Sequence, residues 1–543
     1  MRNLKILISV GLSFLFLFSL SLQHFTTFDS YFHMQVAKHY KENWFSTLLQ
    51  KVGMVDLSTY PPLAHQILAL IPLQIEISYS LLTIFFTILL SFYSAKFILS
   101  YLKISKNFWI IYFFVLTTPT LLITIYTFGQ YTTVIGLTFS FISLYYFSEF
   151  LNKKQKAYLF LASLSFILTA YSHLLSFLIL SIFYALIFLL NFKIAIKNLK
   201  LIFVHFFFSI VLIASIYYPI FTKQIVQKEI WHWSRYPLEN ELNVQRFKNF
   251  YGFSFPISLL LPFMILNLKR KQRKKILEIY IITLVFLILG LGTTTPFTKI
   301  FGEFSHWLTY ERFLLIASIL FSLMFAASLP QIEIRFKKWK FPISTILILS
   351  IWIAASINLL LETHSIFFQD PIKTYDKNIR QQYTQFALNF LNNVSKNYRY
   401  QTFGYGRPIG EIYFYSKLPT LDTDYFTGRK IEWIRESGID EIDQVGDEKF
   451  LDVFLSRATN YSIKYIITFS DFYSDHLQSK GWKVISQESF GSKKVIIWEN
   501  PENVNEIRFE KEKYGLINYL RGILPLTLLS IFIFAIIKFQ IKN

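Results

Sequence analysis

The sequence contains no cysteine and few charged residues for its length. The absence of cysteine excludes disulfide bonds, thiolate metal ligands and a cysteine nucleophile. Charged residues make up 16% of the 543 residues, whereas soluble globular proteins contain roughly 25%. Hydrophobic residues make up 53% of the chain, and its mean hydropathy is positive. This composition predicts a protein whose solvent is largely lipid.

The hydrophobic residues are grouped in blocks of roughly 16 to 24 residues, the length that a helix needs to cross a bilayer. Clear blocks cover residues 4–22, 79–102, 131–148, 174–192, 200–221, 341–361 and about 517–538, and shorter ones cover 108–123 and 254–268. Ser19-Leu20-Ser21 is a poor cleavage signal, so we expect the first block to remain as an uncleaved helix. We predict an α-helical polytopic membrane protein with about twelve spans.

The net charge of +20 would suggest nucleic-acid binding in a soluble protein, but its placement indicates another role. Basic residues cluster in every second connection, whereas the short loops 124–130 and 171–173 contain no Lys or Arg. This alternation is the positive-inside pattern, and it predicts that both termini are cytoplasmic. We therefore expect a multi-pass protein of the cell membrane whose partner is the lipid bilayer and not nucleic acid. The basic clusters are Arg2/Lys5, Lys103/Lys106, Lys153/Lys154/Lys156, Lys193/Lys197/Lys200, Lys269 to Lys275, Arg335 to Lys340 and Lys538/Lys542.

Three units follow from this topology. Residues 1–361 form a predicted transmembrane domain, which includes a first outer loop at 23–61. Residues 362–515 mix charges with short strand-like and helix-like runs, so they predict a small extracytoplasmic α/β domain. Residues 516–543 form the final transmembrane helix and a cytoplasmic tail.

Aspartate is scarce in the transmembrane domain, and its two occurrences there are informative. Asp29 and Asp56 are the only aspartates in the first 369 residues, and both lie in the first outer loop. A carboxylate at the membrane surface can accept a proton from a hydroxyl group or hold a divalent cation beside a phosphate. His33 follows Asp29 by four residues, so a helix would place both side chains on one face. We regard Asp29, His33 and Asp56 as candidate catalytic residues, although each is also compatible with an ordinary solvated loop.

Further polar residues recur at the outer ends of the spans. Glu311 and Arg312 begin a span, and charges so near hydrocarbon are costly unless they are paired or functional. A guanidinium suits phosphate oxygens, so Arg312 is a candidate for binding a lipid phosphate, with an interfacial snorkelling role as the alternative. The other candidates for substrate binding are Glu311 beside Arg312, Arg235 in WHWSRYP, His65 after Pro61-Pro62, Gln130 in YTFGQYTT and His173 in AYSHLL. Together they predict a polar cavity that opens outward.

Several short motifs resemble the GT-C superfamily of membrane glycosyltransferases. They are an acidic residue after the first span, then YPPL, a GQY turn, SHLL and ERFLL. DSYFHMQ also resembles the first loop of oligosaccharyltransferase catalytic subunits, but no WWDYG follows in the outer domain. RYQTFGYG and KLPTLDTDYFTGRKIEWIRESGIDEID resemble the 6-pyruvoyl-tetrahydropterin-synthase-related multipass membrane proteins.

The GT-C resemblance implies transfer of a sugar from a polyprenyl-phosphate carrier to a glycan, lipid or protein acceptor on the outer face. It implies that Asp29 is the base or a ligand of a divalent cation such as Mg²⁺ or Mn²⁺, and that Arg312 faces the donor phosphate. The family's first loop often has two adjacent acidic residues, whereas here Ser30 follows Asp29. A non-catalytic membrane scaffold and a transporter or lipid flippase are the alternatives. A transporter would place ionisable residues near the bilayer midplane, whereas these residues lie at span ends.

Overall fold

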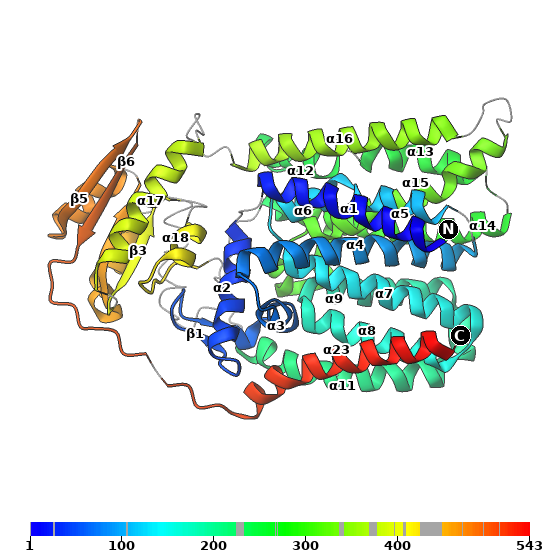
Figure 1. The fold of residues 1–543 in the computed structure, drawn as a ribbon, viewed down its shortest axis with the longest axis horizontal. Coiled ribbons are helices and arrows are strands. Elements are labelled where there is room, and N and C mark those ends of the chain that lie inside the picture. The colour runs from blue at the N-terminus through cyan, green and yellow to red at the C-terminus, as the bar shows by residue number, and fades with distance from the viewer. Residues whose placement is uncertain are drawn as a thin grey trace.

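Apolar helices and a small sheet form two adjoining units along the long axis of the molecule (Figure 1). The structure is a computed structural model that describes residues 2–24, 28–104, 107–223, 233–252, 254–266, 268, 270–335, 342–368, 377–395, 397–405, 409–423, 448–469, 471–491, 493–509 and 511–542. Both chain termini lie at the end of the bundle away from the sheet (Figure 1).

The helical bundle is built from the hydrophobic blocks of the sequence. Its longer helices are α1 (Arg2–His24), α4 (Ile75–Leu102), α7 (Tyr131–Lys153), α8 (Lys156–Ser172), α9 (Leu174–Leu190), α11 (Leu199–Lys223), α13 (Ser254–Leu266), α14 (Arg270–Gly290), α15 (Glu311–Arg335), α16 (Pro342–Phe368) and α23 (Leu516–Lys542). The block at 108–123 is a bent pair, α5 (Phe108–Leu116) and α6 (Pro119–Tyr126), which meet at 44°. Short helices α10 (Phe192–Lys197) and α12 (Glu241–Tyr251) lie in connections.

Five described helices are individually long and apolar enough to cross a membrane: α4, α7, α11, α15 and α23. The bent pair α5–α6 qualifies as one further span, and shorter apolar helices such as α8 and α9 pack among them. The polytopic helical fold is therefore confirmed. The number of about twelve spans stays a prediction, because the shorter helices do not reach the length of roughly 18 to 20 residues by themselves.

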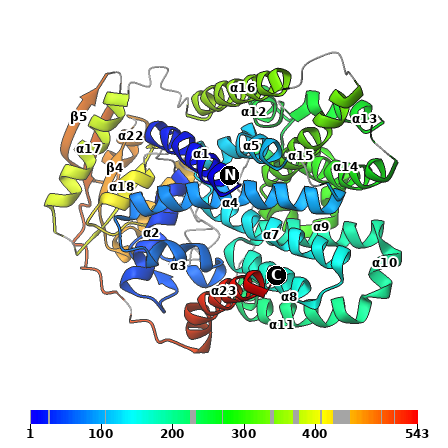
Figure 2. The same cartoon turned by 45° about the vertical axis from the view of Figure 1, so that its right-hand side comes forward.

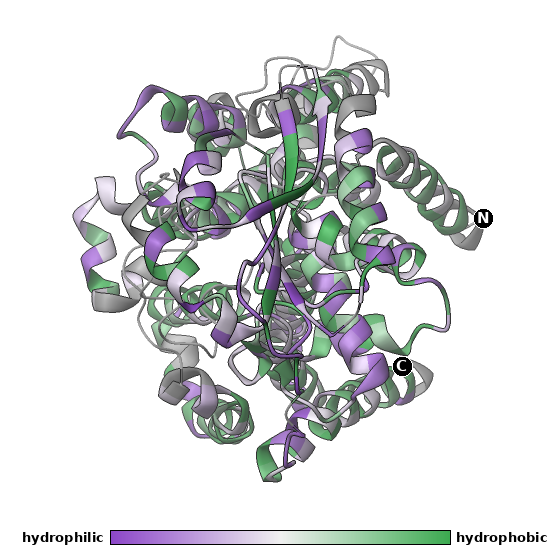
Figure 3. Cartoon of the chain, turned by 90° about the vertical axis from the view of Figure 1, so that its left-hand side faces the viewer, coloured by the Kyte–Doolittle hydropathy of each residue, from purple (hydrophilic) through white to green (hydrophobic). Residues whose placement is uncertain are grey.

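The α/β domain contains a four-stranded sheet in the order β3 (Arg399–Phe403), β4 (Ile463–Thr468), β6 (Lys493–Glu499), β5 (Lys483–Phe490). β3 and β4 are parallel, and the other pairs are antiparallel. Viewed from this domain, the strands mix hydrophilic and hydrophobic residues (Figure 3). Helix α17 (Lys377–Asn393) covers one part of the sheet, where the rings of Tyr383 and Phe469 lie 4.3 Å apart. A second small core, which includes Phe403 and Trp498, packs α21 (Glu448–Arg457) and α22 (Ser474–Ser479) against it.

The first outer loop joins the two units. It contains α2 (Phe28–Glu42), a hairpin of β1 (Leu48–Leu49) and β2 (Val55–Asp56), and the turn η1 (Leu57–Thr59); α3 (Leu63–Leu70) follows it. Helix α18 (Ile409–Tyr415) of the α/β domain packs on α2, with 5.7 Å between the rings of Tyr31 and Phe414. Gly53 has a φ of +67°, and a Cβ there would lie 2.5 Å from Cβ of Thr423, so a larger residue would separate the loop from the domain.

The last helix holds the same loop from the other side. Arg521 of α23 is fully buried and donates from Nη2 to the carbonyl oxygens of Leu57, at 2.8 Å, and Tyr60. Just before α23, the Glu512 carboxylate accepts 2.7 Å hydrogen bonds from the hydroxyls of Ser46 and Thr47. Burial would raise the pKa of Glu512, but these bonds and others from the loop lower it below its ordinary value. The C-terminal segment therefore stabilises the loop that carries the candidate site.

Candidate functional site

Helix α2 carries the first two candidate residues. It begins at Phe28, so Asp29 lies in its first turn and His33 one turn later, as the sequence predicted. His33 is buried, whereas Asp29 is half-buried at the edge of the helix. The helix therefore presents a carboxylate at the surface of the bundle and an imidazole inside it.

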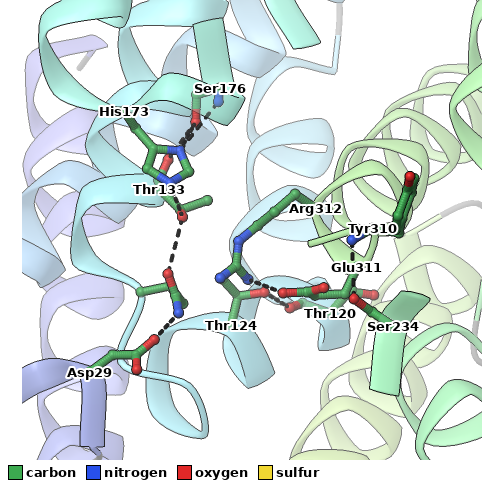
Figure 4. Close-up of polar contacts among 11 residues, drawn as sticks. Asp29, Thr120, Thr124, Thr133, His173, Ser176, Ser234, Tyr310, Glu311 and Arg312 are labelled. Carbon is green, nitrogen blue, oxygen red and sulfur yellow. Dashed lines mark hydrogen bonds and ion pairs between the residues drawn. The ribbon is translucent and has the colours of Figure 1, made fainter. Parts of the chain in front are cut away.

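Asp29 is the end of a hydrogen-bond chain that crosses from α2 to α7 and α9. Gln130, the residue before α7, donates through Nε2 to Oδ2 of Asp29. Thr133 lies 3.4 Å from both Oε1 of Gln130 and Nε2 of His173. Gly136 permits this approach, because a Cβ there would lie 2.9 Å from Cβ of His173. Figure 4 shows the chain from Asp29 to His173.

The direction of donation along this series of hydrogen bonds follows from His173, the residue at its far end. The backbone N–H of Ser176 donates to Nδ1 of His173 at 3.2 Å, so in a neutral imidazole the proton is on Nε2. His173 then donates to Thr133, Thr133 donates to Gln130, and Gln130 donates to Asp29. Every donor in the series points toward the carboxylate, which favours its ionised, proton-accepting form.

His33 and His65 form a second part of the site. Nδ1 of His33 lies 3.0 Å from Nε2 of His65, which follows Pro61-Pro62 on α3. The ring of Tyr60 packs on His65 with centroids 5.3 Å apart, and its hydroxyl lies 3.2 Å from Oγ1 of Thr132. Burial lowers the pKa of His33 well below its usual range, so this imidazole is neutral at pH 7. The neighbouring guanidinium of Arg312 lowers it further.

Arg312 brings a buried positive charge to the same region. It lies in the first turn of α15 and is 4% exposed. Nη1 lies 3.3 Å from Oε1 of Glu311, but neither Nη1 nor Nε makes a hydrogen bond within the described part of the chain. The guanidinium lies between Glu311 and the chain from Asp29 to His173 (Figure 4). A buried guanidinium with unused donors is suited to an anionic ligand.

Arg235 lies beside the start of α15, where it fixes the backbone. Its Nε donates to the carbonyl oxygen of Leu308 at 3.3 Å, and its own carbonyl accepts from Thr293 at 2.6 Å. The neighbouring Ser234 accepts from the backbone N–H of Tyr310 at 3.1 Å. These contacts give Arg235 a positioning role for the turn that precedes Arg312.

Asp56 has a local structural role in the first outer loop. Oδ1 accepts from the backbone N–H of Ser58 at 2.8 Å and so caps η1. This cap shapes the turn that leads into Tyr60 and the proline pair. Its catalytic role stays a prediction, and the contacts that assemble the Asp29 chain do not include it.

The expected divalent cation stays a prediction. Across the described residues, no group of three or more His, Cys, Asp or Glu side chains is arranged to hold a metal ion. One oxygen of Asp29 is already engaged by Gln130. We therefore derive no chemical step through a metal, and metal dependence stays a question for assay.

Two residues that position the site, Thr133 and Arg521, are not part of the motifs found in the sequence. Thr133 carries the chain from Gln130 to His173, but threonines are common in apolar helices and nothing in its spacing marks it. Arg521 does have a signal in the sequence, because it is a charge near the start of the final apolar block. Its contacts with the first outer loop connect residues more than 450 positions apart, so only the folded chain reveals its role.

The fold defines a class: the chain is a helical membrane protein with a GT-C-like fold and a small α/β domain. The crystal structure of ArnT from Cupriavidus metallidurans bound to undecaprenyl phosphate is similar, with a TM-score of 0.53 and 8% sequence identity. That similarity covers 92% of this chain and 98% of the other.

The apo oligosaccharyltransferase from Archaeoglobus fulgidus gives a TM-score of 0.40 at 11% identity, over 86% of this chain and 69% of that one. No protein-family model and no curated protein matches the sequence. The resemblance to 6-pyruvoyl-tetrahydropterin-synthase-related proteins therefore stays an expectation, and part of its motif, residues 424–443, lies outside the described residues.

Proposed function

We propose that this protein is a glycosyltransferase that moves a sugar, of the hexose class, from a polyprenyl-phosphate carrier to an acceptor hydroxyl. The observation that carries the proposal is the pairing of two features in one region: the carboxylate of Asp29, at which a chain of donors ends, and the buried guanidinium of Arg312, which retains unused donors. A base beside an anion-binding cation is what displacement of a phosphate by a hydroxyl requires.

The reaction is a single displacement. Asp29 accepts the proton of the acceptor hydroxyl, and the acceptor oxygen forms a bond to the anomeric carbon. The bond from that carbon to the phosphate oxygen breaks, and polyprenyl phosphate leaves with the electron pair. Arg312 stabilises the charge that develops on the phosphate, with Arg235 fixing the turn that positions it.

Three further supports come from the fold and the charge pattern. The GT-C-like fold is shared with a structure solved with undecaprenyl phosphate bound. The site lies at the end of the bundle that carries the α/β domain (Figure 1). The described basic residues that follow α4, α7 and α9 and that begin α14 belong to the connections at the other end. By the positive-inside rule, the site and the α/β domain then face outward and both termini are cytoplasmic.

The experiment compares wild type, Asp29→Asn and Arg312→Gln in detergent with a panel of radiolabelled polyprenyl-phosphate sugars and a membrane extract as acceptor. We expect Asp29→Asn to lose activity by roughly 10² to 10⁴ and Arg312→Gln by roughly 10² to 10³. Asp471→Asn is the matched control, because Asp471 is an exposed acid of the α/β domain. The same assay with a chelator and with added Mg²⁺ or Mn²⁺ tests metal dependence.

Full activity of Asp29→Asn in a folded protein would remove Asp29 from the mechanism. A wild-type protein without turnover on any donor, but with transport activity in vesicles, would favour the transporter or lipid flippase. A protein with neither activity, whose α/β domain captures an envelope enzyme, would favour the scaffold.

A further inference from the structure

A pocket lies at the opposite end of the bundle from the candidate site. It has a volume of about 560 Å³, within the range of small-ligand sites. The last turn of α4, the end of α9 and the first turns of α14 line it. In Figures 1 and 2, α14 lies toward the end of the molecule where both termini are found.

The pocket has an excess of positive charge. Lys103, Arg270, Lys274 and Lys275 line it, against the single acid Glu278. Lys275 is neutralised internally, because its Nζ lies 2.7 Å from Oε2 of Glu278. The other three basic residues leave a net charge that favours an anion.

Glu278 adds a second recognition element. Its Oε2 accepts from Tyr101 at 2.5 Å as well as from Lys275. Its Oε1 is buried and has no hydrogen-bond partner within the described residues, and the side chain is only 5% exposed. A buried acceptor of this kind needs a donor, which a hydroxyl group of a ligand would supply.

The surroundings of the pocket are apolar and exposed. Asn191, which donates to the Glu278 carboxylate at 3.3 Å, is flanked by Leu189 and Phe192. These two side chains are 69% and 61% exposed, as expected for groups that face lipid. A ligand with a phosphate, a hydroxyl group and hydrocarbon chains would contact the cations, Glu278 and this apolar surface together.

We propose that this pocket binds the head group of an anionic, hydroxyl-bearing glycerophospholipid such as phosphatidylglycerol. Lys103, Arg270 and Lys274 contact its phosphate, and Oε1 of Glu278 accepts from its glycerol hydroxyl. Basic pockets between helices on the cytoplasmic side are a known means of binding lipid phosphates. This lipid site is separate from the proposed donor site, which lies at the other end of the bundle.

The test measures lipid retained by the full-length protein, purified in detergent and incubated with phosphatidylglycerol or phosphatidylcholine, by native mass spectrometry. We expect at least about tenfold more phosphatidylglycerol than phosphatidylcholine on the wild type. The triple variant Lys103→Gln, Arg270→Gln, Lys274→Gln should lose roughly a hundredfold, because each basic residue contributes about fivefold. Lys274→Gln alone, an exposed position, should lose about fivefold.

The matched control removes the same charge elsewhere at the same end of the bundle. Lys154, Lys156 and Lys200 are exposed residues outside the pocket, so their triple Gln variant should retain the lipid as wild type does. Equal loss in both triple variants would overturn the proposal in favour of diffuse attraction, and no loss in either would show that these cations do not bind the lipid. Displacement of the lipid by millimolar inorganic phosphate would overturn the lipid assignment in favour of a free-phosphate site.

Discussion

Arg521→Met tests whether the final helix holds the first outer loop in place. Arg521 donates to the carbonyl oxygens of Leu57 and Tyr60, directly before the proline pair. Hydrogen bonds from a charged group are each worth about 1.5–3 kcal/mol. A buried methionine returns about 1.5–3 kcal/mol through its apolar surface. The net loss is about 1.5–3 kcal/mol, which raises the opening equilibrium of the loop roughly 10- to 150-fold.

Amide hydrogen exchange at Ser58 and Tyr60 measures this opening, because both amides are bonded within the turn. Ser58 donates to Asp56 at 2.8 Å, and Tyr60 donates to Leu57 at 3.0 Å. Both should exchange faster in Arg521→Met by the calculated factor. Arg521→Lys, which keeps the charge but has a single nitrogen, should give a smaller increase. Unchanged exchange in Arg521→Met would refute the idea that this residue fixes the loop.

Three further predictions concern the site and its support. Gly136→Leu should displace His173 and lower transferase activity at least about tenfold. Gly11→Ala should leave activity unchanged, because a Cβ at Gly11 meets nothing within 4 Å. Equal effects of the two substitutions would argue against the close contact at Gly136. The lowered pKa of Glu512 stabilises the folded protein above the ordinary pKa of 4.5, and this stability is lost as pH falls through the pKa of the folded state. In Glu512→Gln, the melting temperature should therefore depend less on pH below about pH 5. The lowered pKa of His33 makes the folded protein lose stability as pH falls below the ordinary pKa of 6.5, because the unfolded chain then binds the proton more readily. The melting temperature of His33→Gln should therefore depend less on pH between about pH 5 and 7. Parallel curves of melting temperature against pH for wild type and either variant would contradict the assignment.

The helices and strands of this protein are largely readable from its sequence, because each depends on a local pattern. The strand-like runs in residues 362–515 correspond to β3, β4, β5 and β6, and a helix-like run there corresponds to α17. The irregular block at 108–123 becomes a bent pair, since Pro119 cannot continue the helix that precedes it. What the patterns leave open is how these elements pack.

Within the site, the sequence by itself determined the local pair and the individual candidates. The four-residue spacing of Asp29 and His33 places them on one helix face, and this needs only helix geometry. The tertiary structure alone decided that Gln130 reaches Asp29 and that His33 meets His65. It also placed Asp56 where it caps η1, and Arg521 where it bonds the backbone of the first outer loop. Side-chain hydrogen bonds depend on distances of a few ångströms between elements, and these are set by the packing of whole helices, which no short stretch of sequence encodes.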